Sequence, residues 1–245
     1  MIFLKNIFKN IKIGKNNYIE KNVKIHKNVI IGDNNKIYNG TILYPNTIIG
    51  NNNTILNNNI IGEHPINSNE IFENKIFKGV KIGNNNFFHI SNKIYGGSSD
   101  ITFIGDNNKI LGENHIGHDC IINNYVNIYP RTLLCGYVKM LDYSGSGVGT
   151  YVHQHKVIGH FGFTSMNSSI TKNSFPFFIN INNKYSKINY HRILTVNDLT
   201  NIKDYEKILI DINNKYILKN LSIDEYKEQL PENIYNILND FLSYK

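Results

Sequence analysis

The sequence predicts an all-β fold, a left-handed parallel β-helix built from hexapeptide repeats, followed by a small α-helical C-terminal region. Three observations support this: aliphatic residues recur every six positions, glycine often follows them, and asparagine gathers between them. The aliphatic positions at the start of the chain are Ile13, Ile19, Ile25, Ile31, Ile37, Leu43, Ile49, Ile55 and Ile61. A turn every six residues bends the chain into triangular coils, with the aliphatic side chains pointing inward.

Asparagine predicts where the coils turn. Asn tolerates the left-handed backbone conformation, and stacked Asn side chains can form hydrogen bonds along the axis. We therefore expect corners at residues 34–35, 51–53 and 84–86, each of which is a run of Asn.

The six-residue period breaks twice, and each break predicts a loop outside the coils. The first loop is expected at 63–80, because the step from Ile61 to Ile82 is not a multiple of six; the second is expected at 95–103. From Ile104 the period continues to Ile170. With about eighteen residues in a coil, this predicts eight to nine coils in a β-helix of residues 1–190. Loops inside a compact repeat are usually functional.

Residues 191–245 are expected to be helical. Tyr205, Leu209 and Ile212 have helical spacing, and residues 222–225 read as a capping box that starts a helix. A last helix is predicted over 232–242.

Composition narrows the choice of partner and compartment. The formal net charge is +7, which favours anionic partners, but no dense Lys/Arg run or RNA-binding signature is present, so we expect no nucleic-acid partner. The two cysteines, Cys120 and Cys135, suit a reducing cytoplasm. The first residues lack an apolar stretch long enough for a signal peptide or a membrane span, so a cytoplasmic protein without a membrane span is expected.

The densest polar cluster surrounds His118. Because Ile116 points inward, the flanking His115 and His118 must point elsewhere, and Asp119 can orient the His118 imidazole. Steps of eighteen place His118, Gly136 and Gln154 in one column, with His153, His155 and His160 in the same coil as Gln154. A histidine beside a glycine offers what acyl transfer needs: a base for the acceptor and a backbone N–H for the oxyanion.

Two motifs carry a resemblance to a known family. His115-Ile116-Gly117-His118-Asp119-Cys120, with Val152-His153-Gln154 and Ile158-Gly159 after it, resembles the UDP-N-acetylglucosamine acyltransferase family. These are hexapeptide-repeat acyltransferases that open lipid A biosynthesis, and their fold includes sugar-nucleotide N-acyltransferases. The resemblance covers most of the chain.

The resemblance implies roles for individual residues. His118 is expected to be the general base, Asp119 its support and Gly136 the source of the oxyanion amide. The substrate site is expected to contain His115, Tyr137, His153, Gln154 and, from the first loop, His64. The resemblance also implies a homotrimer with sites between neighbouring prisms, a donor thioester on coenzyme A or acyl carrier protein, and no metal.

Departures from the family pattern predict a changed substrate. Tyr137 stands where the family usually has His, and the sugar-gripping segments are replaced at 63–70 and 90–94. Met166 stands where long-chain members have Gly, and with Phe163 it is expected to fill the acyl groove, because a packed apolar site resists extra methylenes. The first interpretation is therefore transfer of a short acyl group, such as acetyl, to an amine or hydroxyl of a nucleotide-linked sugar for surface polysaccharide or lipopolysaccharide.

Three other functions stay open. The first is a UDP-N-acetylglucosamine 3-O-acyltransferase of lipid A biosynthesis. The second is a non-catalytic β-helix scaffold, which would need neither the His–Asp pair nor two loops. The third is a metalloenzyme that resembles the γ-class carbonic anhydrases, but zinc needs three convergent ligands and no three histidines stack at multiples of eighteen. His26 and His89 are read as solvated or structural.

Overall fold

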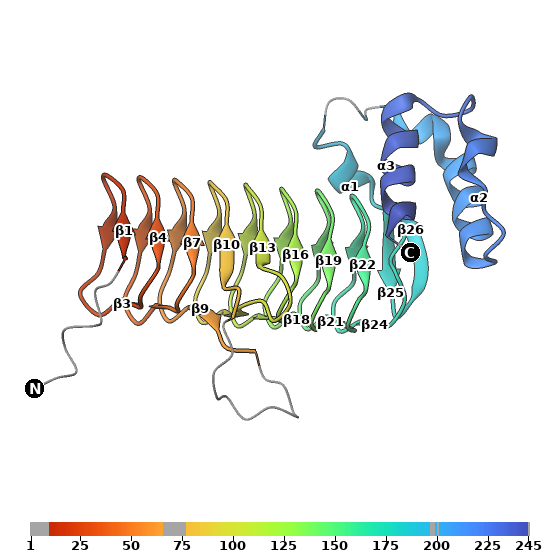
Figure 1. Cartoon of the computed structure of the whole chain (residues 1–245). Helices are drawn as coiled ribbons and strands as arrows, with labels where there is room; N and C mark the ends of the chain where they lie inside the picture. The colour runs from red at the N-terminus through yellow and green to blue at the C-terminus, as the bar shows by residue number, and fades with distance from the viewer. Residues whose placement is uncertain (1–9, 66–76, 197–198, 200, 245) are drawn as a thin grey trace, which may run out of the picture.

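The computed structural model describes residues 10–65, 77–196, 199 and 201–244. These residues form the predicted left-handed parallel β-helix, with short helices gathered at its C-terminal end (Figure 1). Each coil contributes one short strand to each of three sheets. Two sheets have eight strands and the third has ten, which agrees with the predicted eight to nine coils.

The strands follow the six-residue period along the chain. The first sheet contains β1 (Lys12–Ile13), β4 (Ile30–Ile31), β7 (Ile48–Ile49), β10 (Val80–Ile82), β13 (Thr102–Ile104), β16 (Ile121–Ile122), β19 (Lys139–Met140) and β22 (Val157–Ile158). The second contains β2 (Tyr18–Ile19), β5 (Lys36–Ile37), β8 (Thr54–Ile55), β11 (Phe87–Phe88), β14 (Lys109–Ile110), β17 (Asn127–Ile128), β20 (Gly145–Ser146), β23 (Phe163–Thr164), β25 (Phe178–Ile181) and β26 (Lys184–Ile188). The third contains β3 (Lys24–Ile25), β6 (Ile42–Leu43), β9 (Ile60–Glu63), β12 (Lys93–Tyr95), β15 (His115–Ile116), β18 (Leu133–Leu134), β21 (Tyr151–Val152) and β24 (Ser169–Ile170).

The inward positions form the core of the β-helix. Ile55 and Ile116 are fully buried, whereas Ile13 in the first described coil is 49% exposed, since no described coil covers it. Two positions of the six-residue period between Ile13 and Ile170 are polar, Ser146 and Thr164, and both are fully buried. Ser146 Oγ lies 2.9 Å from Thr132 Oγ1, so hydroxyl groups within the prism satisfy one another.

The asparagine corners are as predicted. Asn34 and Asn52 have φ values of 57° and 58°, which is the left-handed region. Beside them, Asn53 Nδ2 donates to Asn35 Oδ1 at 3.0 Å, and Asn86 Nδ2 donates to Asn53 Oδ1 at 3.0 Å. The amide side chains therefore form a ladder that ties successive coils together.

Farther along, the same line of corners changes from asparagine to aromatic residues. Tyr125, Tyr143, Phe161 and Phe177 stack in sequence, with centroid separations of 4.7, 4.9 and 5.6 Å and interplanar angles of at most 7°. Each has a positive φ between 57° and 72°. Arg192 lies over the Tyr143 ring and donates from Nε to the Tyr143 carbonyl at 3.0 Å. This aromatic column, residues 125, 143, 161 and 177, joins the coils to the helical region.

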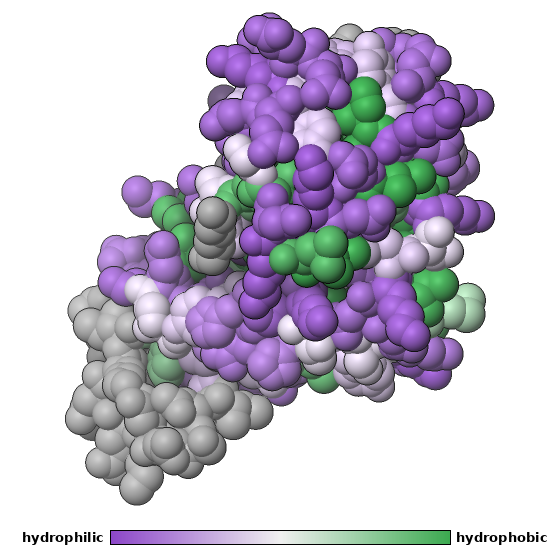
Figure 2. All heavy atoms as spheres, turned by 90° about the vertical axis from the view of Figure 1, so that its right-hand side faces the viewer, coloured by the Kyte–Doolittle hydropathy of each residue, from purple (hydrophilic) through white to green (hydrophobic). Residues whose placement is uncertain are grey.

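The C-terminal region packs on the last coils through a second apolar core that includes Phe175, Leu209 and Phe241. It consists of the β25–β26 hairpin, α1 (Tyr190–Ile193), η2 (Ile202–Tyr205), α2 (Glu206–Ile217), η3 (Ile223–Tyr226) and α3 (Glu232–Ser243). Figure 2 faces this end of the molecule, where apolar side chains are exposed among polar ones; Ile217 and Leu218 in this region are 53% and 72% exposed.

The predicted capping box at 222–225 is wrong. Ser222 precedes a single 3₁₀ turn, η3, and its side chain makes no cap hydrogen bond. Glu225 instead pairs with Lys215 Nζ of α2 at 3.2 Å, because the two segments pack against each other. The predicted last helix is present as α3.

The two breaks in the period lie next to the region of His118. β9 ends at Glu63 and β10 begins at Val80, and residues 66–76 of the first expected loop lie outside the described residues. β12 ends at Tyr95 and β13 begins at Thr102, so the segment 96–101 connects them.

Candidate active site

His118 and Asp119 lie at the corner that follows β15. Asp119 has a φ of 58°, and its backbone N–H donates to Thr102 Oγ1 at 2.8 Å. The Asp119 side chain is 2% exposed, whereas the His118 side chain is 26% exposed. The corner thus buries the carboxylate and leaves the imidazole accessible.

The two side chains are joined by a short hydrogen bond. His118 Nδ1 lies 2.6 Å from Asp119 Oδ2. Because an ionised carboxylate can only accept, Nδ1 carries the proton and Nε2 of a neutral ring is left as a proton acceptor. This arrangement suits a general base.

The segment between β12 and β13 closes around the Asp119 carboxylate. The backbone N–H groups of Ser98, Ser99 and Asp100 donate to it at 3.0, 2.9 and 2.6 Å, and Ser98 Oγ donates at 2.6 Å. Burial raises the pKa of Asp119, but the hydrogen bonds from Ser98, from the Asp100 amide and from His118 outweigh it and lower the pKa to about 2. Asp119 is therefore ionised at neutral pH.

Gly136 lies one coil beyond His118, as the steps of eighteen predict. A Cβ on Gly136 would lie 2.6 Å from Cε1 of His118, so the ring occupies the space that only glycine leaves. At the corner that follows the first sheet, the equivalent amides donate to a side chain of the next coil, as Asn124 does to Asp142 Oδ1 at 2.8 Å.

The amide of Gly136 has no side-chain partner of this kind among the described residues. The next coil places Gln154 in this column, and the Gly136 N–H makes no hydrogen bond to the part of the chain that the structure describes. An N–H beside the imidazole is thus available to an oxyanion.

Tyr137 forms one wall of the site. Its ring meets His118 edge-on, with centroids 5.2 Å apart, and stacks on His155 at 4.6 Å. Its hydroxyl lies 2.9 Å from Ser99 Oγ and 3.4 Å from Ser98 Oγ. The two serines were not predicted from the sequence, and the signal for them was their place in the second break of the repeat.

His115 lies on the adjacent strand, with its ring 4.9 Å from that of Tyr95. Burial, followed by the charges of Lys93 and His118, lowers the pKa of His115. Lys93 itself pairs with Glu63 at 2.8 Å. A polar stripe on the third sheet, Glu63, Lys93, Tyr95 and His115, therefore leads from the first break in the period towards His118.

The other residues predicted for this part of the site do not contact His118 directly within the described chain. His153 and Gln154 are exposed in the coil beyond Gly136, and it is His155 that contacts Tyr137. His160 turns away and bonds Asp240 Oδ2 of α3 at 2.8 Å.

His64, Phe163 and Met166 lie apart from the dyad. The His64 ring packs 4.3 Å from that of Phe77, in the first break, and makes no contact with His118 among the described residues. Phe163 meets Tyr129 edge-on at 6.2 Å, and Met166 is 67% exposed.

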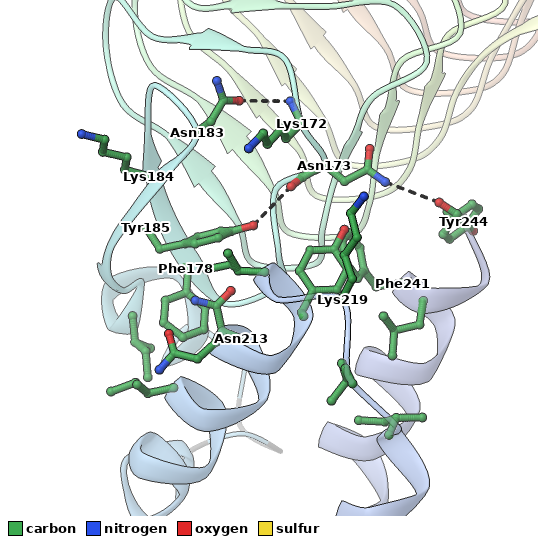
Figure 3. A pocket seen from close by; sticks show the side chains of 18 of the residues that line it. Lys172, Asn173, Phe178, Asn183, Lys184, Tyr185, Asn213, Lys219, Phe241 and Tyr244 are labelled. Atoms are coloured by element: carbon green, nitrogen blue, oxygen red, sulfur yellow. Dashed lines mark hydrogen bonds between the residues drawn. The ribbon is translucent and has the colours of Figure 1, made fainter.

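A large cavity lies elsewhere in the molecule. It measures about 1650 Å³ and separates the last coils and the β25–β26 hairpin from α2 and α3, as Figure 3 shows for Lys172, Tyr185 and Lys219. None of the predicted site residues lines it. The His118 site is instead an open corner of a single prism.

Two general findings concern the residues that the structure describes. No cluster of three or more His, Cys, Asp or Glu side chains is arranged to hold a metal ion in them. Their helices are all too short or too polar to cross a membrane.

Comparison with known proteins supports the fold and the motifs. Residues 10–45 match the family described as bacterial transferase hexapeptide (six repeats). An acyl-[acyl-carrier-protein]–UDP-N-acetylglucosamine O-acyltransferase of Pseudomonas paraeruginosa is 41% identical over 71 residues, which is 29% of this chain and 28% of that protein. The enzyme of the same description from Nautilia profundicola is 37% identical over 101 residues, 40% and 39% of the two chains. The sequence matches thus span less than half of these relatives.

Solved structures match over nearly the whole chain. The UDP-N-acetylglucosamine acyltransferase of Bacteroides fragilis superposes with a TM-score of 0.79 at 25% identity, covering 96% of this chain and 93% of that one. The acyltransferase of Campylobacter jejuni gives 0.81 at 23% identity, covering 95% and 91%. The resemblance expected from the sequence is confirmed, locally by sequence and over nearly the whole chain by fold.

Proposed function

We propose that this chain, which resembles UDP-N-acetylglucosamine acyltransferases, transfers an acyl group from a thioester on acyl carrier protein to a hydroxyl of UDP-N-acetylglucosamine. The observation that carries the proposal is the His118–Asp119 pair, whose ring lies against Gly136, a residue with an N–H that is unbonded in the described part of the chain. The names of the relatives give these substrates, and they support this function better than transfer of a short acyl group to another nucleotide sugar.

The proposed reaction begins with proton abstraction. Nε2 of His118 takes the proton of the acceptor hydroxyl while that oxygen forms a bond to the thioester carbonyl carbon. The Asp119 carboxylate stabilises the imidazolium that results, because it accepts from Nδ1–H throughout. The carbonyl π electrons move to oxygen, and the Gly136 N–H donates to the oxyanion.

The second half of the reaction returns the proton. The tetrahedral intermediate re-forms the carbonyl, the carbon–sulfur bond breaks, and the leaving thiolate takes the proton from Nε2 of the imidazolium. The enzyme is restored, and the products are the acylated nucleotide sugar and a free thiol. A metal ion is not needed for this sequence of proton transfers.

The acceptor side is supported by the polar stripe of Glu63, Lys93, Tyr95 and His115. These side chains lie on the sheet that carries β15, next to His118. We propose that the stripe holds the sugar nucleotide, with Tyr137, His153 and Gln154 on the other side of the dyad. The Lys93 side chain is 39% exposed, and its ammonium group suits a diphosphate.

A trimer is part of the proposal. His118 lies on an open corner, and exposed apolar side chains lie on the outer faces of the later coils: Tyr129, Val148, Tyr151 and Met166 are 40%, 40%, 54% and 67% exposed. A neighbouring prism would cover these side chains and complete the walls of the site. Such a heterologous contact closes into a ring when three copies meet.

A second candidate keeps the chemistry and changes the substrates. Met166 and Phe163 would shorten an acyl groove along the later coils, and Tyr137 changes the wall next to Gly136. These residues favour a shorter acyl group, from coenzyme A or acyl carrier protein, and an amine or hydroxyl of another nucleotide sugar as acceptor.

The test is a product assay with a panel of substrates. Purified protein is mixed with acyl carrier protein thioesters or coenzyme A thioesters of several chain lengths and with a panel of nucleotide sugars. The product is followed by mass spectrometry, and nucleotide binding by thermal shift. Acylated UDP-N-acetylglucosamine supports the first proposal, and a preference for another nucleotide sugar supports the second. If no pair gives a product and no nucleotide shifts the melting temperature, both are wrong.

A further inference from the structure

The segment Gly96–Asp100, between β12 and β13, is anchored before it reaches the site. The Gly96 N–H donates to the Glu63 carbonyl at 2.8 Å, and the Gly97 N–H donates to the Gly79 carbonyl at 2.9 Å. A Cβ on Gly97 would lie 1.5 Å from the Asp100 carbonyl oxygen, so the turn is too tight for any other residue. The backbone of this segment is therefore held in one conformation over Asp119.

Within this segment, Ser98 has a distinct position. Its hydroxyl lies 2.6 Å from Asp119 Oδ2, 3.3 Å from His118 Nδ1 and 3.4 Å from the Tyr137 hydroxyl. Ser99 and Asp100 reach the carboxylate through backbone N–H groups, which any residue would supply. Ser98 instead uses its side chain: its hydroxyl bonds Oδ2, the carboxylate oxygen that also bonds the imidazole.

From this geometry, and resting on the function proposed above, we infer that Ser98 is a positioning residue for the reaction. Its hydroxyl holds Asp119 Oδ2 in line with Nδ1 of His118, and so keeps the ring in the tautomer whose Nε2 is free to accept a proton. Ser98 itself touches neither the acceptor nor the thioester.

Two features of Asp119 explain why one hydroxyl matters. Oδ2 accepts three hydrogen bonds, from the Ser98 N–H, the Ser98 hydroxyl and His118 Nδ1, whereas Oδ1 accepts two backbone bonds. Loss of the hydroxyl removes a 2.6 Å donor from Oδ2 and leaves only the Ser98 N–H, at 3.0 Å, to hold that oxygen opposite the imidazole. Those hydrogen bonds also contribute to the lowered pKa of Asp119, which keeps the group an acceptor.

The substitutions are chosen to distinguish the effect of the Ser98 hydroxyl on the reaction from an effect on folding. Ser98→Ala removes the hydroxyl and keeps the backbone donor. Ser98→Thr keeps the hydroxyl, and the exposed position leaves room for the added methyl group. Ser186→Ala, on the exposed strand β26, is a matched control for removal of a surface serine hydroxyl far along the chain from the site.

The first measurement is steady-state kinetics with the substrates found above. Ser98→Ala is expected to lower kcat by about 10- to 100-fold, the factor for one lost hydrogen bond to a charged group, and to leave KM for the nucleotide sugar within about twofold. Ser98→Thr is expected to restore kcat to within about threefold of the wild type. Wild-type kcat in Ser98→Ala, or no rescue in a folded Ser98→Thr protein, overturns the inference.

The second measurement does not depend on turnover. Nitrogen-15 spectra of protein labelled at histidine distinguish the two neutral tautomers of His118, which are assigned by comparison with His118→Ala. The wild type is expected to show Nδ1–H, and Ser98→Ala a mixture of the two tautomers. An unchanged tautomer in Ser98→Ala overturns the inference. If the wild type transfers no acyl group at all, the proposed function fails, and these spectra still decide the role of Ser98.

Discussion

The imidazole of His118 lies against the backbone of Gly136, in the space where any other residue would carry its Cβ. A Cβ there would be 2.6 Å from Cε1 and 2.7 Å from Nε2 of His118, closer than any real contact. Gly136→Ala must therefore push the ring away from the amide. Alanine keeps the N–H but separates it from the base, so we expect kcat/KM to fall by about 10²–10³-fold, within the range for loss of a general base.

The control for Gly136→Ala is Gly112→Ala, in an earlier coil, where the nearest atom to a new Cβ would be 3.1 Å away. Both variants are compared with the wild type by initial rates and by thermal melting. Equal activity of the Gly136→Ala variant and the wild type would show that the close fit of the His118 ring against Gly136 is not needed for the reaction.

His118→Ala is expected to abolish turnover with little change in stability. The side chain is 26% exposed and lies outside the inward core, so its loss leaves the coil packed. Removal of a general base costs about 10²–10⁴ in rate. His89→Ala, which changes a histidine outside the site, controls for the loss of an imidazole. An active variant, or one that no longer folds, would contradict the assignment.

Met166→Gly is expected to lengthen the acyl chain that the protein accepts. Met166 is 67% exposed on the outer surface, and Phe163, three residues earlier, packs on Tyr129. If a neighbouring prism covers them, they fill the groove, and each extra methylene would add strain of about 1–3 kcal/mol. A donor series from acetyl to myristoyl thioesters is run on both proteins. The idea fails if the wild type already prefers long chains or if the glycine variant shows no shift.

A trimer is expected in solution. Light scattering at micromolar concentration gives the mass, and the expected value is three times the 28.2 kDa of one chain. A monomer mass would rule out a site shared between two chains.

The buried Asp119 predicts a pH dependence of stability. Its pKa is about 2 in the folded chain and near 3.8 when unfolded, so ionisation stabilises the fold. This contribution is fully present above pH 4 and is lost as pH falls towards 2. Asp119→Asn is expected to lower the free energy of unfolding at pH 7 by about 1–3 kcal/mol, because an amide cannot accept all the donors around it. Urea melts at pH 7, 4 and 2 check both points, and a difference between the two proteins that does not shrink from pH 4 to pH 2 would contradict the role of the charge.

The regular coils could be predicted closely from the sequence. Ile116 and Leu134 are paired in adjacent strands eighteen residues apart, and that spacing alone brings His118 to Gly136. Asn34 and Asn52 were predictable as corners because the left-handed conformation selects for asparagine. The conformational preference of asparagine and the strict six-residue period predict the same fold, so the sequence gives no conflicting signal in the coils.

The segments outside the period could not be predicted in this way. Ser98 lies in a break of the repeat, where the eighteen-residue spacing of the coils no longer predicts which residues are neighbours. Its contact with Asp119 depends instead on the path of a tight turn at Gly97. The expected cap at Ser222 failed for a related reason. Glu225 found a partner in Lys215, and packing between segments decided the local structure.

The alignment of corners along the axis also limits how such a chain can change in length over evolution. Ile49 pairs with Ile82, 33 residues later, and Ile82 pairs with Ile104, 22 residues later, where regular neighbours are eighteen apart. An insertion that is neither a whole coil nor excluded from the prism would rotate every later corner and break the stacking of the asparagine and aromatic residues along it. Added residues are therefore tolerated only as whole coils or as segments expelled sideways. The second expelled segment supplies the donors to Asp119, so an insertion that left the coils intact could have created part of the site.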